Sequence, residues 1–303
     1  MIHLFPMKDK RYSLKWTIDR NKAGLSIKQF LADEGISQRA LTDIKFAGGK
    51  ITVNGMEQNV RYLLNEDEIL EVMFPLEQTN ESLRAEDLPL EIMYEDRDLL
   101  VINKQAGMST IPSREHPNGN LANALVYYYK QNQIYAAVHI VTRLDRDTSG
   151  LVLIAKHRHA HHLLSIMQQQ FRIDRSYEAF VTGKWREKYG TIDVPIGRKC
   201  DSIIEREVRI DGKRAVTHYS LLQQYNDFSH IKLNLETGRT HQIRVHMAYK
   251  NHPLIGDDLY GGDTTLMQRQ ALHCRELSFE HPIIKTKLTF IAPLSEDMQL
   301  LLN

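Results

Sequence analysis

The stretch that organises this chain is Thr-Arg-Leu-Asp-Arg-Asp-Thr-Ser-Gly-Leu-Val-Leu-Ile-Ala-Lys, residues 142–156. Its first half is polar and carries two carboxylates, Asp145 and Asp147, among arginines. Its second half, residues 151–155, is a continuous apolar run, which predicts a short strand buried on both faces. Gly150 permits a sharp entry into that strand. The pattern therefore predicts a charged loop fixed to the end of a core strand, an arrangement that presents reactive groups from a rigid scaffold.

Spacing alone leaves two interpretations of the charged loop. One is a solvated turn with a surface ion pair, which contributes only roughly 0–1 kcal/mol. The other follows from a resemblance: Arg-Leu-Asp-Arg-Asp-Thr-Ser-Gly-Leu resembles the signature of the RluA-type pseudouridine synthases, which isomerise uridine in RNA. The resemblance makes Asp145 the catalytic aspartate. We expect Asp147 to hold the loop through local backbone hydrogen bonds. Most members have histidine where this chain has Thr142, so the resemblance assigns that position no role.

Two later stretches extend the resemblance. Residues 175–181, Arg-Ser-Tyr-Glu-Ala-Phe-Val, predict a strand and resemble the family's second motif, which implies that Tyr177 stacks on the target base. From the residues alone, this side chain is equally a core tyrosine with a satisfied hydroxyl. Residues 236–247 resemble the third motif, which implies an ion pair between Arg244 and the catalytic aspartate. Thr240 is expected to cap a helix that begins there.

Other residues of these motifs are expected to contact RNA. Arg143, beside the catalytic aspartate, is expected to fill the gap left by an extruded base or to grip a phosphate. The candidate RNA-binding residues of the third motif are Arg239, Thr240 and His241. Residues 104–108 resemble the family's first motif, with Gln105 where most members have proline. Lys104 is interpreted either as an RNA contact or as a solvated side chain.

The amino-terminal region predicts a small α+β unit. The expected elements are an alternating strand, two helices, a hairpin at Asn54-Gly55 and a final strand. This order resembles the S-four RNA-binding domain, named for a ribosomal protein, in which the second helix and the following turn lie on RNA. The basic residues at those places are Arg39, Lys45 and Lys50. The alternative is a solvated helix face, because Asp43 dilutes the positive charge.

The domain organisation follows from these patterns. Residues 75–88 are polar and acidic and lack an apolar period, so they predict a linker. We expect an S-four-like domain over residues 12–74 and a catalytic domain over residues 89–303. The resemblance implies that the fold class is α+β, with a mixed, largely antiparallel central sheet flanked by helices and loops and preceded by the small α+β domain.

The composition is that of an ordinary soluble globular protein, with 303 residues, 42% hydrophobic and 25% charged. The formal net charge is +1, so charge that binds RNA must be placed locally. Cys200 and Cys274 make no disulfide framework, and neither a signal peptide nor a membrane span is visible. We therefore expect a cytoplasmic monomer with no membrane contact and no obligate protein partner.

Four histidines fall within residues 157–162, His-Arg-His-Ala-His-His. A metal site is one interpretation, because His157 and His161 lie one helical turn apart. We expect no metal there, since no nearby acidic or cysteine ligand completes a site and the His-Glu-x-x-His pattern is absent. The apolar period of this helix predicts instead that the histidines lie mainly on its outer face, where they can touch phosphate.

The chemistry fits these residue types. Pseudouridine formation breaks the bond between ribose and a base nitrogen, rotates the base, and rejoins ribose to a ring carbon, without a cofactor or a redox change. It needs an ionised carboxylate that acts as nucleophile, as base, or as both. Burial disfavours the charged form of a carboxylate, and a neighbouring arginine opposes that effect. Asp145 with Arg244 is therefore a sensible pair, although the two are far apart in sequence.

The sequence thus predicts an RNA pseudouridine synthase. By family analogy we expect large-subunit ribosomal RNA as the substrate, with tRNA as the alternative. A non-catalytic RNA-binding factor for ribosome assembly or translation is a competing interpretation, built on the amino-terminal domain. The sister group of synthases that act on small-subunit ribosomal RNA is another, although the Asp-Thr-Ser-Gly loop favours the RluA type. A metal-dependent hydrolase that uses the histidine cluster has the least support.

Overall fold

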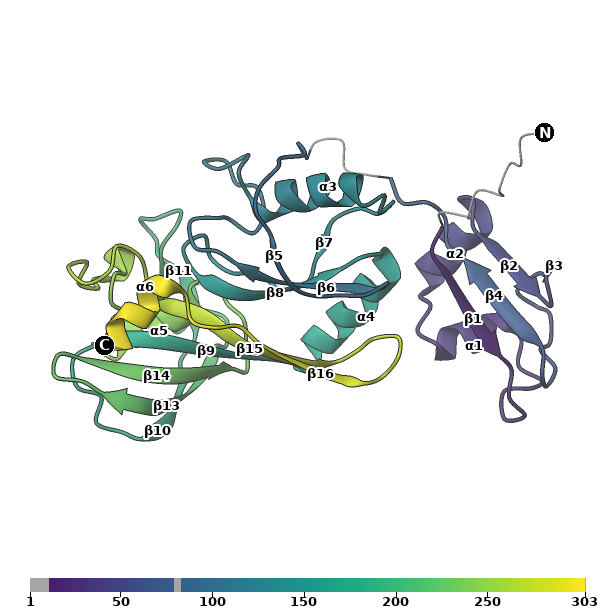
Figure 1. Cartoon of the computed structure of the whole chain (residues 1–303). Coiled ribbons are helices and arrows are strands. Elements are labelled where there is room, and N and C mark those ends of the chain that lie inside the picture. The colour runs from purple at the N-terminus through teal and green to yellow at the C-terminus, as the bar shows by residue number, and fades with distance from the viewer. Residues whose placement is uncertain (1–10, 79–82, 303) are drawn as a thin grey trace.

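The computed structural model describes residues 11–78 and 83–302, and it contains a small and a large β-sheet with separate apolar cores (Figure 1). A two-stranded hairpin, β11 (Ile196–Arg198) and β12 (Arg206–Val208), stands apart from both sheets. No helix or strand occurs in residues 75–78 or 83–88, within the predicted linker. Among the described residues, no helix has the length and apolar character needed to cross a membrane.

The small sheet is antiparallel and has the strand order β1-β4-β2-β3. Its strands are β1 (Ser13–Thr17), β2 (Lys50–Val53), β3 (Met56–Glu57) and β4 (Ile69–Met73), and its helices are α1 (Ile27–Asp33) and α2 (Gln38–Phe46). The side chains of Ser26 and Ser37 cap the two helices. Asn54 and Gly55, both at positive φ, form the predicted hairpin turn. The sheet is consistent with the S-four-like domain that the sequence predicted.

The large sheet confirms the predicted fold class. Its path is β10-β13-β14-β9-β15-β8-β6-β5, with β16 beside β15 and β7 beside β8, ten strands in all. Only the pair β8 and β15 is parallel among the described strands. The strands are β5 (Glu91–Glu95), β6 (Leu99–Lys104), β7 (His139–Ile140), β8 (Ser149–Ala155), β9 (Ile173–Thr182), β10 (Tyr189–Asp193), β13 (Val216–Gln224), β14 (Phe228–Leu235), β15 (Leu272–Glu280) and β16 (Lys287–Ile291).

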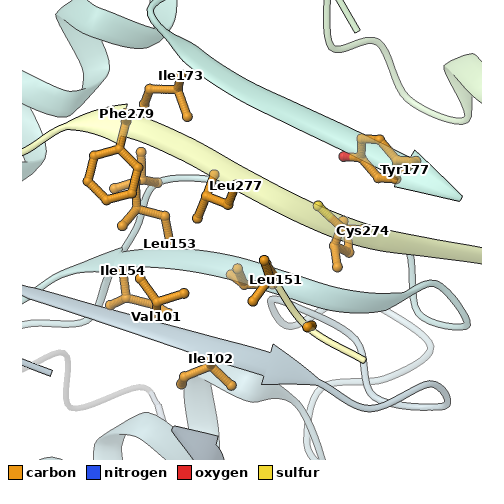
Figure 2. Packing of buried hydrophobic residues seen from close by; sticks show 14 of the residues in the cluster. Val101, Ile102, Leu151, Leu153, Ile154, Ile173, Tyr177, Cys274, Leu277 and Phe279 are labelled. Carbon is orange, nitrogen blue, oxygen red and sulfur yellow. The ribbon is translucent and has the colours of Figure 1, made fainter. Parts of the chain in front are cut away.

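Strand β8 is the buried centre that its apolar run predicted, since all of its residues are buried. Figure 2 shows Leu151 and Leu153 of this strand packed among side chains of β6, β9 and β15. Gly150 has φ +111°, and a Cβ there would lie 2.3 Å from the carbonyl oxygen of Cys274. Only glycine therefore allows the backbone of β15 to approach β8 this closely.

Three helices flank the large sheet. They are α3 (Leu121–Gln131), α4 (Arg158–Gln169) and α5 (Gln242–Tyr249), and a short helix, α6 (Glu296–Gln299), lies near the carboxyl terminus. In the view of Figure 1, α3 lies above strands β6 and β8 and α4 lies below them, and both helices contribute to the main apolar core. Helix α5 is the next element after β14, and its first residues line a cleft of the large domain.

The junction between the two sheets overturns one prediction, because the first histidines of the cluster do not lie on an outer face. His157 and His159 are 5% and 4% exposed. The ring of Tyr12 stacks on His157 with centroids 3.6 Å apart, and the ring of Phe74 stacks on His159. The amino-terminal domain thus covers the start of α4 at these two histidines. Burial lowers the pKa of His159 to about 3, so this side chain is a neutral packing element and cannot hold phosphate by charge.

Ionisable groups around the junction are joined by hydrogen bonds. Asp96, Asp98 and His281 place their ligand-type atoms within 4.8 Å of one another. Each also has protein partners: His281 bonds to Asp96, while Asp98 accepts from Tyr12 and bonds to His157. Burial opposes the charge on Asp96, but hydrogen bonds from His281 and Tyr94 outweigh it and hold the pKa of Asp96 well below its usual range. This cluster joins the small domain to the large one.

Candidate active site

The charged loop between β7 and β8 is held from below by buried side chains. The hydroxyl of Thr110 accepts from the amide of Leu144 and donates to its carbonyl oxygen, at 3.1 and 2.7 Å. The hydroxyl of Thr142 accepts from the amide of Leu153 at 2.9 Å. Two threonines therefore fix both the entrance and the middle of the loop.

Lys104 lies beneath the loop, and both earlier interpretations of it were wrong. It is 1% exposed, so it faces neither RNA nor solvent. Its Nζ donates to the carbonyl oxygens of Gln105, Met108 and Arg146, at 2.8, 2.8 and 3.1 Å. Burial lowers its pKa to about 7, against the opposing attraction of Asp147 and Asp145. The residue thus joins the first motif to the charged loop.

Asp147 plays a smaller part than we expected. Its side chain accepts no hydrogen bond from the described residues, so the prediction that its carboxylate holds the loop was wrong. Its backbone carbonyl instead accepts from Arg269 at 2.9 Å. The local backbone bond of the loop runs from the amide of Thr148 to the carbonyl of Asp145, at 3.2 Å.

The structure brings Asp145 and Arg244 together. Nη1 of Arg244 lies 3.7 Å from Oδ2 of Asp145, although 99 positions separate them in sequence (244 − 145). The Asp145 side chain is 29% exposed and that of Arg244 is 8% exposed. The carboxylate therefore faces solvent, and the guanidinium is packed behind it. Nε2 of His241 approaches the same Oδ2 atom at 3.9 Å. This geometry suits a carboxylate held by cationic or polar groups on one side and accessible on the other.

The main partner of Arg244 was not predicted from the sequence. Asp257, which is fully buried, accepts from Nε and Nη2 of that arginine at 2.7 Å each. The ring of Tyr260 lies under the same guanidinium, 4.9 Å from its central carbon. The sequence motifs had assigned no role to Asp257 or Tyr260. A buried arginine requires a carboxylate for bidentate pairing, and that requirement was the available signal.

Helix α5 does not begin as predicted. Its cap residue is His241, at φ +56°, and not Thr240, and no side chain caps the helix. The orphan groups of the preceding turn are satisfied by Gln242. Its Oε1 accepts from the amide of Arg239 and the hydroxyl of Thr237, and its Nε2 donates to Thr217. A buried amide thus replaces the expected cap and fixes the third motif against β13.

These groups line one cleft of about 930 Å³, a size typical of ligand sites. The sequence-predicted residues that line it are Asp145, Arg244, Tyr177, Arg143, Arg239, Thr240 and His241. Tyr177 forms part of its wall from β9 and is 4% exposed; its position beside Cys274 of β15 is visible in Figure 2. Burial raises the pKa of the Tyr177 hydroxyl, so the phenol stays neutral. The cleft therefore joins an acid, an aromatic ring and several cations.

The arginines of the cleft differ in how firmly other protein groups hold their side chains. Arg143 is exposed at the rim and makes no hydrogen bond or ion pair with any described residue. Arg239 is also exposed, with its Nε bound to the carbonyl of Arg214 at 2.9 Å. Arg175 lines the wall of the cleft, and its Nη1 lies 3.5 Å from the hydroxyl oxygen of Tyr177. An unpaired arginine at the rim of the cleft, with hydrogen-bonded arginines beside it, is an arrangement suited to binding phosphate.

The three basic candidates of the amino-terminal domain do not line this cleft. Arg39 and Lys45 are exposed on α2, and Lys45 lies over the ring of Phe46. Lys50, at the start of β2, is 3.9 Å from Glu57. Asp43, the acidic residue among these basic side chains, forms an ion pair with Arg158 of the large domain at 3.0 Å.

Comparison with known proteins agrees with this chemistry. A family model described as RNA pseudouridylate synthase matches residues 98–249. The uncharacterized RNA pseudouridine synthase YjbO of Bacillus subtilis is 51% identical over 92% of this chain and 99% of its own length. The ribosomal large subunit pseudouridine synthase D of Pseudomonas aeruginosa is 40% identical over 84% of this chain and 83% of its own. The solved structure of human RNA pseudouridylate synthase domain containing 1 has a TM-score of 0.58, 25% identity, and covers 69% of this chain and 85% of its own.

Proposed function

This chain belongs to the RluA-type family of RNA pseudouridine synthases, which are isomerases, and from that premise we propose that it converts specific uridines of large-subunit ribosomal RNA to pseudouridine. The choice of RNA rests on relatives near 40% identity that are named ribosomal large subunit pseudouridine synthase D. The amino-terminal domain supports a large structured substrate. The ion pair of Asp145 and Arg244 at the accessible floor of a cleft is the observation that carries the assignment of the site.

Asp145 is the group that acts on the uridine. Its carboxylate attacks as a nucleophile, removes a proton, or does both in turn, while the base leaves through N1 and returns through C5. Arg244 supplies a fixed positive charge 3.7 Å from that carboxylate. The position of Arg244 behind the carboxylate, with its own side chain 8% exposed, leaves the open side of the acid to the substrate.

The uridine must leave its stack to reach this acid, at a cost of a few kcal/mol. Tyr177, on the wall of the same cleft, stacks on the extruded base and recovers roughly 1–3 kcal/mol. Arg143 at the rim has no protein partner among the described residues, so it is available to fill the gap in the RNA or to bind a phosphate. Arg239, Thr240 and His241 complete the RNA-facing wall.

The domain over residues 12–74 holds RNA outside the cleft, through Arg39, Lys45 and Lys50. In this assignment residues 75–88 are the linker and residues 89–303 the catalytic domain. The exposure of Arg39 and Lys45 on α2 supports a surface role. Because they do not line the cleft, they add affinity and orientation but take no part in the chemistry.

The substrate is tested by mapping pseudouridine in total RNA from cells with and without the gene. We expect one or a few sites of large-subunit ribosomal RNA to be lost in the deletion strain and restored by the wild-type gene. Loss of a tRNA site with intact ribosomal RNA would contradict the choice of substrate. An unchanged map would contradict catalysis and favour a non-catalytic RNA-binding factor.

A further inference from the structure

His241 is placed at the cleft by an unusual backbone. Its φ of +56° is left-handed, a conformation that costs a non-glycine residue roughly 1–2 kcal/mol. It starts α5 without using its side chain as a cap. The imidazole points elsewhere: Nδ1 lies 2.9 Å from the Tyr260 hydroxyl, and Nε2 lies 3.9 Å from Oδ2 of Asp145. Strain of this kind persists where the side chain it delivers has a use.

The neighbours of the imidazole determine where its proton sits. The Tyr260 hydroxyl oxygen accepts from the backbone amide of Arg206 at 2.9 Å, and a backbone amide can only donate. The hydroxyl hydrogen is therefore free to point at Nδ1 of His241. On the other side of the ring, Nε2 faces a carboxylate, which repels a lone pair and attracts an N–H. Both contacts favour the neutral tautomer that carries its hydrogen on Nε2. Burial lowers the pKa of His241 despite the attraction of Asp145, in keeping with a neutral ring.

We propose that His241 is a positioning residue that, together with Arg244, seats one particular oxygen of Asp145. Nε2 of His241 and Nη1 of Arg244 both approach Oδ2, at 3.9 and 3.7 Å. Neither carboxylate oxygen of Asp145 accepts a hydrogen bond from a described residue, but both donors come nearest to Oδ2. In this proposal the two donors seat Oδ2, and Oδ1 is the atom presented to the uridine. Contacts of this length tighten when a substrate closes the site.

Tyr260 acts on the acid through His241. Its ring supports the guanidinium of Arg244, and its hydroxyl fixes the tautomer of His241. One aromatic side chain thereby orients both donors to the same oxygen. The inference rests on the proposed function, since it assumes that Asp145 reacts, and it moves His241 from the RNA-binding set to the support of the acid.

The test compares two replacements of His241. His241→Asn keeps a residue that tolerates positive φ and an amide near the Nδ1 position, but it cannot reach Asp145. His241→Gln places an amide N–H near the Nε2 position. His162→Asn, the same change at a partly exposed position of α4, is the matched control. The measurements are single-turnover tritium release from [5-³H]uridine-labelled ribosomal RNA of cells lacking the gene, and retention of that RNA on filters.

We expect His241→Asn to slow tritium release by about 10- to 100-fold, the effect of losing a hydrogen bond to a charged group that forms as the site closes. RNA affinity should stay within about twofold of wild type. His241→Gln should recover most of that loss. Tyr260→Phe, which keeps the ring over Arg244, should slow release by a smaller factor, since His241 then loses its fixed tautomer. Thermal unfolding of each variant verifies the fold.

Two outcomes would overturn the inference. One is a His241→Asn variant with the wild-type rate of release. The other is a variant whose defect is confined to RNA affinity, because that would return His241 to the RNA-binding set. Both are distinct from failure of the proposed function, which would appear as no tritium release by the wild-type protein or as release by Asp145→Asn.

Discussion

At the scale of single residues, the site depends on how the donors of one guanidinium are divided. Arg244 gives Nε and Nη2 to buried Asp257 and turns Nη1 toward Asp145. The bidentate pair fixes the plane of the guanidinium before any substrate arrives. Asp145 therefore meets a donor that does not need to be reoriented during the reaction.

Replacing Asp257 with asparagine tests this division. The change leaves a buried arginine without its charge partner, so we expect a loss of roughly 3–5 kcal/mol in unfolding free energy. We also expect slower single-turnover chemistry at unchanged RNA affinity, because Nη1 is no longer aimed at Asp145. Denaturant unfolding and tritium release measure the two effects. Asp258→Asn, at the exposed neighbouring position, is the control and should match wild type. Equal behaviour of the two variants would show that the pair with Asp257 is dispensable.

The sequence predicted half of this arrangement. The motifs paired Asp145 with Arg244, and the structure brings the two side chains together. They could not distinguish Asp257 from Asp258, which are the same by type and adjacent in sequence. The difference between them is burial, which is set by the packing of α5 and of the turn against each other, and no local pattern encodes it.

At the scale of elements, side chains from neighbouring segments hold the charged loop in place. Lys104 at the end of β6 reaches across to the carbonyl of Arg146, and Arg269 reaches to the carbonyl of Asp147. In both contacts a side-chain nitrogen donates to a backbone oxygen, so the path of the chain is fixed without contact to the reacting carboxylate. The loop is rigid because its own carbonyl groups are satisfied from outside.

Lys104 also makes the stability of the protein depend on pH. Its pKa is about 7 in the folded state and near 10.5 when unfolded, so between these values unfolding takes up a proton. The contribution of Lys104 to stability is therefore fully present above about pH 10.5 and is lost as the pH falls through about 7. Relative to Lys104→Met, we expect the wild-type protein to gain about 2 kcal/mol of unfolding free energy between pH 7 and pH 9. Urea titrations of both proteins at the two pH values measure the change, and parallel pH dependence would refute it.

Strand β8 was predictable and its neighbour was not. An apolar run after a glycine marks a strand buried on both faces whatever its partner. The parallel pairing with β15 joins His273 to Ser149 across more than a hundred residues, and loop closure of that length leaves no local signature. Gly150 was assigned to a sharp turn, but the close approach of Cys274 is an additional reason for it.

At the scale of the whole molecule, the two domains are joined around one tyrosine. Tyr12 stacks on His157, donates to Asp98 at 2.9 Å, and lies beneath the guanidinium of Arg97. The ion pair of Asp43 with Arg158 adds a second link from α2 to α4. The amino-terminal domain is thus held at a defined place relative to the cleft, which suits recognition of an extended RNA.

Removing Tyr12 should loosen this junction. Tyr12→Ala deletes the stack, the hydrogen bond and the cation–π contact together, so we expect a larger radius of gyration in small-angle X-ray scattering. RNA affinity should fall by about tenfold, which corresponds to 1.4 kcal/mol, while the rate at saturating enzyme stays near wild type. Tyr189→Ala, at a tyrosine that is 80% exposed, is the control. An unchanged radius together with unchanged affinity would argue against a rigid junction.

The sequence predicted two domains but gave a wrong account of the surface between them. Helical period identified the face of α4 that packs on the large sheet, and everything else was assigned to solvent. His157 and His159 lie outside the face that packs on the large sheet, and Tyr12 and Phe74 of the amino-terminal domain bury them. A contact between domains resembles a protein interface, and its polar-aromatic composition is close to that of ordinary surface.

Catalysis depends most on the carboxylate of Asp145, and pseudouridine formation by Asp145→Asn measures the role of that group directly. Asp147→Asn, two positions along the same loop but outside the cleft lining, is the matched control. We predict that Asp145→Asn folds, binds ribosomal RNA like wild type and makes no detectable pseudouridine, whereas Asp147→Asn stays active. Pseudouridine made at the wild-type rate by Asp145→Asn would contradict the central claim.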